Sequence, residues 1–308
     1  MGTPPFAARS LERLLAGRHE IATVVTRPDK PRGRGMTVQA SAVKQLAEKH
    51  GLPVLAPASA KDAALATRLR EIAPDLAVVV AYGRILPRSV LEIPRLGCIN
   101  AHASLLPRLR GAAPIERAIL EGFEETGVTI MRLVEEMDAG PIVAARTLPI
   151  GPETDGGELT DRLSHVAADL LVEVVDSIAR GEATFTEQNS AEATYAPPIE
   201  KAEAEIRWND PVVRVDRVVR AFRPRPGAFT FDGERRLKIE HGRIGGRSDA
   251  DATPGTIVEV GEDGVVVACG EGAFVVHRVQ PEGRKAMSAA AWARGLDRAI
   301  GRRIGVRS

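Results

Sequence analysis

Short apolar runs that alternate with helical segments constrain the fold of this chain more than any other feature. The runs Ile21–Thr26 and Asp75–Ala81 are rich in β-branched residues, as strands buried on both faces are. The segments between them repeat apolar residues at helical spacing. This alternation predicts an α/β domain with a Rossmann-like, mainly parallel sheet covered by helices. Further strands are predicted at 98–100, 128–134 and 142–148, and helices at 8–15, 42–50, 61–72, 114–122 and 158–179.

The pattern changes after residue 182. Residues 183–200 are polar and contain Pro197 and Pro198, which is typical of a linker. Residues 201–308 contain one helical segment, 212–222, followed by five short strands separated by glycine turns, which predicts a small β-barrel. We therefore expect a first domain at 1–182, a linker at 183–200 and a second domain at 201–308.

Composition excludes several classes of protein. With 44% hydrophobic and 27% charged residues, the chain is typical of a globular protein in water, and it has no membrane-length apolar run and no signal-peptide pattern. Cys98 and Cys269 lie in apolar runs and form neither a disulfide framework nor a metal-binding spacing. Reduced, buried thiols favour a cytoplasmic protein, and the lack of a long exposed apolar stripe favours a monomer.

Positive charge is concentrated in the second half. Residues 201–308 hold 20 Lys and Arg against 15 Asp and Glu, whereas residues 1–200 hold 22 against 26. A basic half points to a polyanionic partner, although ordinary variation in composition explains an excess of this size by itself.

The best candidate for a reactive site is the end of the predicted strand at 98–100. Asn100 and His102 are two residues apart, so their side chains point to the same side of an extended strand. An amide N–H stabilises a developing oxyanion, and an imidazole transfers protons near neutral pH. The alternative is a capping Asn beside a surface His. Asp138 is either a turn former or the partner that orients His102.

Two neighbouring segments also have a structural and a functional interpretation. The turn Ser104–Pro107 is either structural or the floor of a site for a flat aromatic ligand. Residues 27–35 contain four cations, one anion, two prolines and two glycines, and we expect them to form an exposed irregular loop without regular structure. That loop is either idle in solvent or binds an anion.

Residues 97–115 read G-C-I-N-A-H-A-S-L-L-P-R-L-R-G-A-A-P-I, and this stretch resembles the signature of the folate-dependent formyltransferases. The Asn-x-His pattern is weak alone, but the ordered set of similar motifs is strong and runs through most of the chain. The other motifs that resemble this family are at residues 2–8, 28–35, 78–87, 125–131, 206–208, 220–222 and 285–288.

The resemblance implies a reaction and a set of residues for it. The donor would be 10-formyltetrahydrofolate and the acceptor the α-amine of methionyl initiator tRNA, with no metal and no nucleotide cofactor. Asn100, His102 and Asp138 match the family's catalytic residues. The residues implied in folate binding are Ser104, Leu105, Leu106 and Pro107 in the turn, with Tyr82, Gly83 and Leu86 lining the pterin pocket.

The resemblance also implies where tRNA binds. In the family the basic loop reaches the acceptor stem, and the second domain, similar to an OB-fold, adds electrostatic attraction. The loop residues implied are Arg32 and Arg34, supported by Arg27 and Lys30, and those of the second domain are Arg284 and Lys285, with Arg302 and Arg303. The stretch 223–226 departs from the family by carrying Arg225 where an aromatic residue is common.

The largest departure is at the start. The family has an apolar strand before Gly-Thr-Pro, whereas Met1 stands here where that strand should end. Losing a central strand leaves the backbone groups of its neighbours unpaired, so we hypothesise that the natural product starts upstream. Two other functions remain open: a formyltransferase acting on an amino-sugar nucleotide, and a catalytically silent RNA-binding homologue.

Overall fold

The computed structural model describes residues 1–32, 37–245 and 252–306. Their contacts divide the chain into two compact units. Unit 1 comprises Met1–Pro114, Glu125–Pro149 and Thr160–Pro197, and unit 2 comprises Ile115–Glu124, Ile150–Leu159 and Pro198–Ser308. The domain boundaries expected from the sequence, 1–182, 183–200 and 201–308, stay a prediction.

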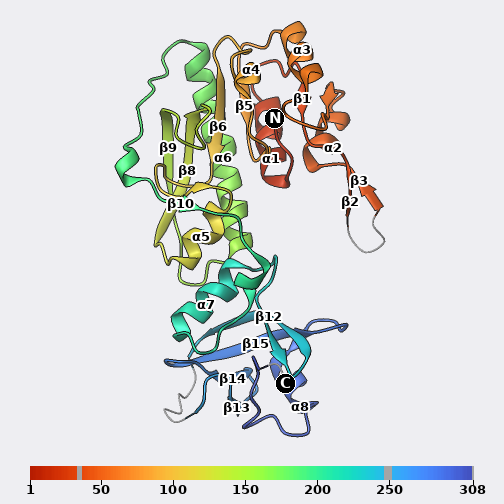
Figure 1. Ribbon diagram of the computed structural model, residues 1–308, viewed down its shortest axis with the longest axis vertical. Coiled ribbons are helices and arrows are strands. Elements are labelled where there is room, and N and C mark those ends of the chain that lie inside the picture. Colours follow the sequence, from red (N-terminus) through yellow and green to blue (C-terminus); the bar gives the residue numbers. More distant parts are fainter. Residues whose placement is uncertain (33–36, 246–251, 307–308) are drawn as a thin grey trace. The chain divides into compact units, whose positions relative to one another are not determined.

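Unit 1 is built on short strands in the α/β arrangement that the sequence predicts (Figure 1). β5 (Ala77–Val79) pairs in parallel with β6 (Cys98–His102). The hairpin of β8 (Glu125–Arg132) and β9 (Ile142–Pro149) then joins β6 in antiparallel fashion, so the sheet order is β5-β6-β8-β9. A separate parallel pair is formed by β1 (Val24–Val25) and β4 (Val54–Leu55).

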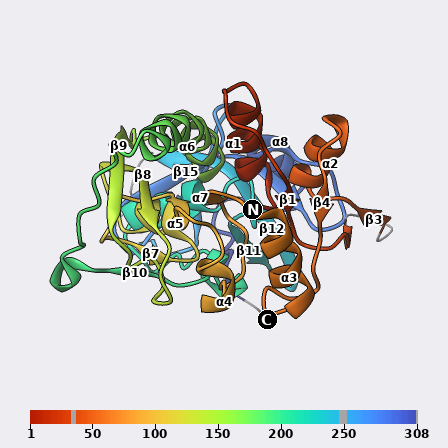
Figure 2. The same ribbon diagram turned by 90° about the horizontal axis from the view of Figure 1, so that it is seen from above.

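Helices cover both sides of these strands, with α1 and α6 on one side and α3 and α4 on the other (Figure 2). Ion pairs join α1 to α6, with Arg9 3.0 Å from Asp161 and Arg13 2.8 Å from Asp169. Ser41 caps α2 by accepting a hydrogen bond from the Lys44 N–H, as the sequence predicts. The helices of this unit are α1 (Pro5–Leu15), α2 (Ala42–Lys49), α3 (Ala63–Ile72), α4 (Arg88–Leu91), most of α6 (Gly156–Ala179) and η1 (Ser190–Glu192).

The expectation that residues 27–35 lack regular structure is wrong for part of the segment. β2 (Lys30–Arg32) pairs with β3 (Thr37–Gln39) as an antiparallel hairpin, while residues 33–36 lie outside the described chain. Pro31 fits this two-stranded ribbon because an edge strand does not need every N–H for pairing. Lys30 and Arg32 therefore belong to a projecting two-stranded ribbon of β2 and β3, here called the basic ribbon (Figure 1).

Unit 2 contains a six-stranded antiparallel sheet of order β11-β12-β15-β14-β13, with β16 beside β15. Register shifts around His241 in β12 mark β-bulges, which increase strand twist and curl the sheet, in keeping with the predicted OB-like domain. Val266, Ala273 and Val275 form a small apolar cluster in this sheet. The strands are β11 (Phe229–Asp232), β12 (Arg235–Ile244), β13 (Ile257–Val260), β14 (Val265–Ala268), β15 (Ala273–Pro281) and β16 (Met287–Ser288). The helices are α5 (Pro114–Leu120), η2 (Lys201–Ala204), α7 (Val212–Ala221) and α8 (Ala289–Arg294).

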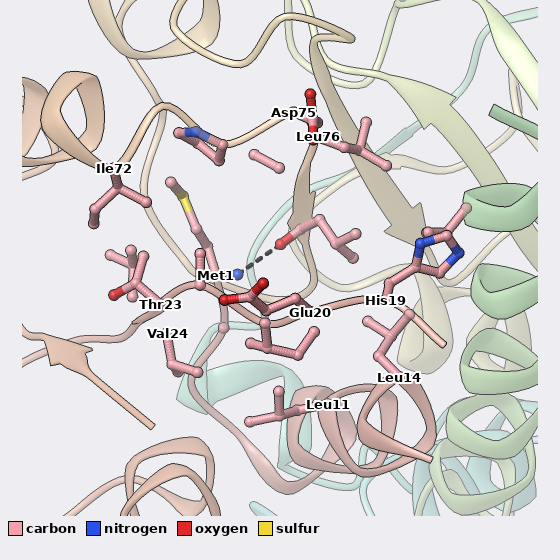
Figure 3. Close-up of a pocket in the computed structure, with 18 of the residues that line it drawn as sticks. Met1, Leu11, Leu14, His19, Glu20, Thr23, Val24, Ile72, Asp75 and Leu76 are labelled. Carbon is pink, nitrogen blue, oxygen red and sulfur yellow. Dashed lines mark hydrogen bonds between the residues drawn. The ribbon is translucent and has the colours of Figure 1, made fainter. Parts of the chain in front are cut away.

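Met1 and Gly2 bridge the two sets of strands in unit 1. The Met1 ammonium donates a hydrogen bond to the Val78 carbonyl at 2.6 Å, and the Gly2 N–H donates to the Val25 carbonyl at 2.9 Å. Beside them lies a cavity of about 570 Å³, lined by α1 residues such as Leu11 and by the edges of the strands (Figure 3). Burial lowers the pKa of the Met1 amine to about 6.

In a protein whose chain begins at Met1, we expect this amine to make unfolding pH-dependent. Its pKa in the folded chain, about 6, is lower than the 8.0 of an ordinary terminal amine, so the unfolded chain binds more protons between these pH values and stability rises with pH. The lowered pKa corresponds to about 2 kcal/mol of stability gained from pH 6 to pH 8. Urea unfolding at both pH values measures it.

A variant with five apolar residues ahead of Met1 is the control, because its Met1 nitrogen is an amide. The difference between the two proteins should depend on pH as stated above. An identical pH dependence for both proteins would contradict the assignment to this amine.

Candidate active site

β6 presents both polar residues of the candidate site. Asn100 and His102 are alternate residues of this strand, which is paired on both sides and therefore holds them rigidly. His102 is buried, and its Nε2 lies 2.9 Å from the Leu109 carbonyl oxygen. Because a carbonyl only accepts, the ring donates from Nε2, which leaves Nδ1 as the basic nitrogen of the neutral imidazole.

Asp138 faces that basic nitrogen. Its Oδ2 lies 3.6 Å from His102 Nδ1 and accepts a hydrogen bond from the Gly111 N–H at 2.9 Å. The residue has a φ of 52°, in the left-handed region, at the turn between β8 and β9. The carboxylate is thus placed to stabilise positive charge on the imidazole.

The Asn100 side chain is half-buried, and within the described residues it has no hydrogen-bond partner of its own. Its N–H groups and carbonyl oxygen are therefore available to a ligand. Together, an amide, an imidazole and a carboxylate give one site a hydrogen-bond donor, a base and a counter-charge. Such a set suits acyl transfer to a nucleophile, in which negative charge develops on oxygen while a proton leaves.

Hydrogen bonds to the Thr129 side chain hold the turn that is predicted to bind folate. The Thr129 hydroxyl donates to the Ser104 carbonyl at 2.7 Å and accepts from the Leu106 N–H at 3.0 Å. Ser104 Oγ donates to the Arg108 carbonyl at 2.6 Å. Leu105 and Pro107 are half-buried, so this rigid turn lies directly after His102 with part of its surface accessible.

The end of β5 holds the other predicted folate residues. Tyr82 and Leu86 are buried among apolar side chains of the core, and burial raises the pKa of the Tyr82 phenol. Gly83 has a φ of 74°, and a Cβ built there would lie 3.1 Å from Arg27 Nη1. Arg27 is accordingly half-buried beside Gly83 rather than extended on the basic ribbon.

The predicted tRNA residues belong to both units. Lys30 is exposed on β2, Arg32 is on the same strand, and Arg34 lies outside the described residues. In unit 2, Arg284 and Lys285 lie in the turn between β15 and β16, and both are exposed. Two further candidates are engaged within unit 2: Arg302 Nε donates to Asp232 at 2.6 Å and Arg303 Nε to the Pro254 carbonyl at 3.1 Å.

Sequence reasoning missed two residues beside the catalytic set. Arg110 on β7 (Arg110–Gly111) is fully buried and donates to Gln188, which belongs to the segment expected to be a linker. That segment also adds β10 (Tyr195–Ala196) in parallel to β7. Arg110 is part of the motif at residues 97–115, so the sequence could have drawn attention to it. No local pattern in residues 183–200 indicated that Gln188 would contact it.

Comparison with protein families identifies the class. Residues 1–175 match the family described as formyl transferase, and residues 198–297 match the formyl transferase C-terminal domain. The chain belongs to the formyl transferase family. In the described part of the chain, no His, Cys, Asp or Glu cluster is arranged to bind a metal ion, and no helix is long and apolar enough to span a bilayer.

Within that family the chain is similar to methionyl-tRNA formyltransferases. The enzyme of Thiobacillus denitrificans is 46% identical over 304 residues, covering 99% of this chain and 98% of that protein. The enzyme of Moorella thermoacetica is also 46% identical, over 305 residues, with 99% and 98% covered.

Solved structures show the same fold at low identity. HypX from Aquifex aeolicus, solved in complex with tetrahydrofolic acid, has a TM-score of 0.60 at 20% identity, covering 80% of this chain and 43% of that chain. An N-formyltransferase from Helicobacter canadensis, in complex with folinic acid and dTDP-3-aminofucose, has a TM-score of 0.64 at 18% identity, covering 89% and 96%.

Proposed function

We propose that this chain transfers the formyl group of 10-formyltetrahydrofolate to the α-amine of methionyl initiator tRNA, for translation initiation. The observation that carries this proposal is the 46% identity to methionyl-tRNA formyltransferases over 99% of the chain, together with the Asn100, His102 and Asp138 arrangement. The enzyme works in the cytoplasm as a monomer.

The role of each residue follows from the charge that develops on the reacting atom beside it. The neutral amine attacks the formyl carbon, so negative charge develops on the formyl oxygen and a proton must leave the nitrogen. The Asn100 amide donates a hydrogen bond to that oxygen. His102 accepts the proton at Nδ1, directly or through water, and Asp138 at 3.6 Å offsets the resulting positive charge. The proton then passes to the leaving nitrogen of the folate.

Different residues bind the two substrates. The turn Ser104–Pro107 and the strand end at Tyr82, Gly83 and Leu86 hold the folate beside His102. Because the Tyr82 and Leu86 side chains are buried in the core, the pterin meets that strand end through its main chain. The basic ribbon and the cations Arg284 and Lys285 bind tRNA phosphates.

One assay with two acceptors tests the function. The protein is incubated with 10-formyltetrahydrofolate and either methionyl initiator tRNA or an amino-sugar nucleotide, and the formylated product is identified by mass spectrometry. We expect formyl-methionyl-tRNA alone. A formylated sugar would establish the other enzyme class, and tRNA binding without any transfer would leave an RNA-binding protein.

The role of the basic segment 27–35 in tRNA binding is tested by Arg34→Ala. Losing one phosphate contact should raise the KM for tRNA and lower the slope of log affinity against log salt by about one unit, with the KM for folate unchanged. Arg68→Ala, on the exposed surface of α3, is the matched loss of charge. A salt slope equal to that of the unsubstituted protein would show that Arg34 contacts no tRNA phosphate.

A further inference from the structure

The Gln188 side chain bridges two carbonyl groups of the turn that carries Asp138. Gln188 Nε2 donates to the Asp138 carbonyl and to the Gly140 carbonyl, both at 2.8 Å. These two bonds span the turn on both sides of Ala139. Asp138 itself has a φ of 52°, a left-handed conformation that costs free energy for a residue with a side chain and persists only when its surroundings hold it.

Arg110 fixes which way the Gln188 amide points. Its Nε and Nη2 donate to Gln188 Oε1 at 3.1 and 2.8 Å. A guanidinium only donates, so Gln188 must turn its oxygen to Arg110 and its NH₂ group to the two carbonyls. The Arg110 side chain is 1% exposed, and its Nη1 lies 3.5 Å from Glu136 Oε1. The backbone N–H of Arg110 donates to the Thr194 carbonyl.

The two carbonyls that Gln188 binds lie next to the carboxylate of the candidate catalytic set. The carbonyls that Gln188 binds belong to the residue whose Oδ2 lies 3.6 Å from His102 Nδ1 and to a close neighbour of that residue. A displacement of the turn by about 1 Å changes the imidazole–carboxylate separation directly, and misplacement on that scale costs about 10²-fold in rate.

We propose that Gln188, oriented by Arg110, is a positioning residue that sets the distance between Asp138 and His102. It acts through Asp138 and touches neither substrate. This inference rests on the proposed function, because its consequence is measured as a rate of formyl transfer.

Gln188→Glu isolates the effect. A glutamate retains the partner of Arg110 and the size of the side chain, but it cannot donate to the Asp138 and Gly140 carbonyls and repels them instead. We expect kcat to fall about 10²-fold while the KM values for folate and tRNA stay unchanged. Glu187→Gln, the reverse exchange at the exposed neighbouring position, should leave kcat unchanged.

The decisive comparison is made in an Asp138→Asn background. If Gln188 acts through Asp138, the double variant should transfer formyl at the rate of Asp138→Asn alone, because the position of the lost carboxylate no longer matters. A further loss equal to that in the unsubstituted background would overturn the proposal, since it would show an independent structural role.

Folding is checked by thermal unfolding, and Gln188→Ala provides a variant without added charge. A wild-type kcat in either folded variant overturns the proposal, and so does unfolding of both variants below the assay temperature, which would make Gln188 a stability residue. An unsubstituted protein that transfers no formyl group would instead contradict the proposed function, so the two failures are distinguishable.

Discussion

Replacing His102 by alanine is expected to lower kcat for formyl transfer by about 10²- to 10⁴-fold, the usual contribution of a positioned base. The imidazole is buried, its Nε2 hydrogen is directed to the Leu109 carbonyl, and its Nδ1 faces Asp138. His102 Nδ1 is therefore the ring nitrogen that can accept the proton released by the attacking amine. Rapid-quench kinetics with saturating substrates measure the loss.

The control for this variant is His50→Ala, at the exposed end of α2, which should leave kcat unchanged. The binding of tRNA should be equal in both variants, because in the proposed mechanism His102 acts on the reacting atoms and on no phosphate. Transfer by His102→Ala at a rate within about twofold of the unsubstituted protein would show that the proton leaves to solvent without help from this residue.

Replacing Asn100 by alanine should lower kcat by about 10²- to 10³-fold, which corresponds to about 3 to 4 kcal/mol of transition-state stabilisation from one oxyanion donor. The half-buried amide has no protein partner among the described residues, so its donor capacity is available to the substrate. Since the oxyanion exists only in the transition state, kcat should fall while the KM for folate stays the same.

Asn100→Asp sharpens this test because the carboxylate has nearly the same shape but cannot donate and repels a developing negative charge. We expect it to be at least as inactive as Asn100→Ala. An aspartate variant that retains most of its activity would mean that the amide orients a substrate instead of stabilising the oxyanion.

The spacing of apolar residues, together with capping and turn residues, was sufficient to predict most elements of the fold. The helix α6 (Gly156–Ala179) and the cap Ser41 follow from local apolar spacing and side-chain chemistry. The strand expected at 21–26 is reduced to β1 (Val24–Val25), because a strand extends only as far as its neighbours pair with it, and β1 has the short β4 on one side and Gly2 on the other. The hairpin of β2 and β3 was missed because its prolines and glycines argue against strands.

The candidate site divides in the same way. The positions of Asn100 and His102 on one strand follow from their spacing, whereas the approach of Asp138 to His102 depends on the pairing of β6 with β8, which no local pattern specifies. Gln188 was beyond prediction for a stronger reason. It lies 78 residues from Arg110 in a polar segment without a regular period, so only the folded chain brings them together.

The most direct test of the account is the single-turnover rate of formyl transfer to methionyl initiator tRNA by the unsubstituted protein and by the double variant Asn100→Ala/His102→Ala. We expect rapid transfer by the unsubstituted protein, and only slow residual transfer by the double variant despite equal tRNA and folate binding. Equal rates for the two proteins, or binding of tRNA without transfer by the unsubstituted protein, would contradict it.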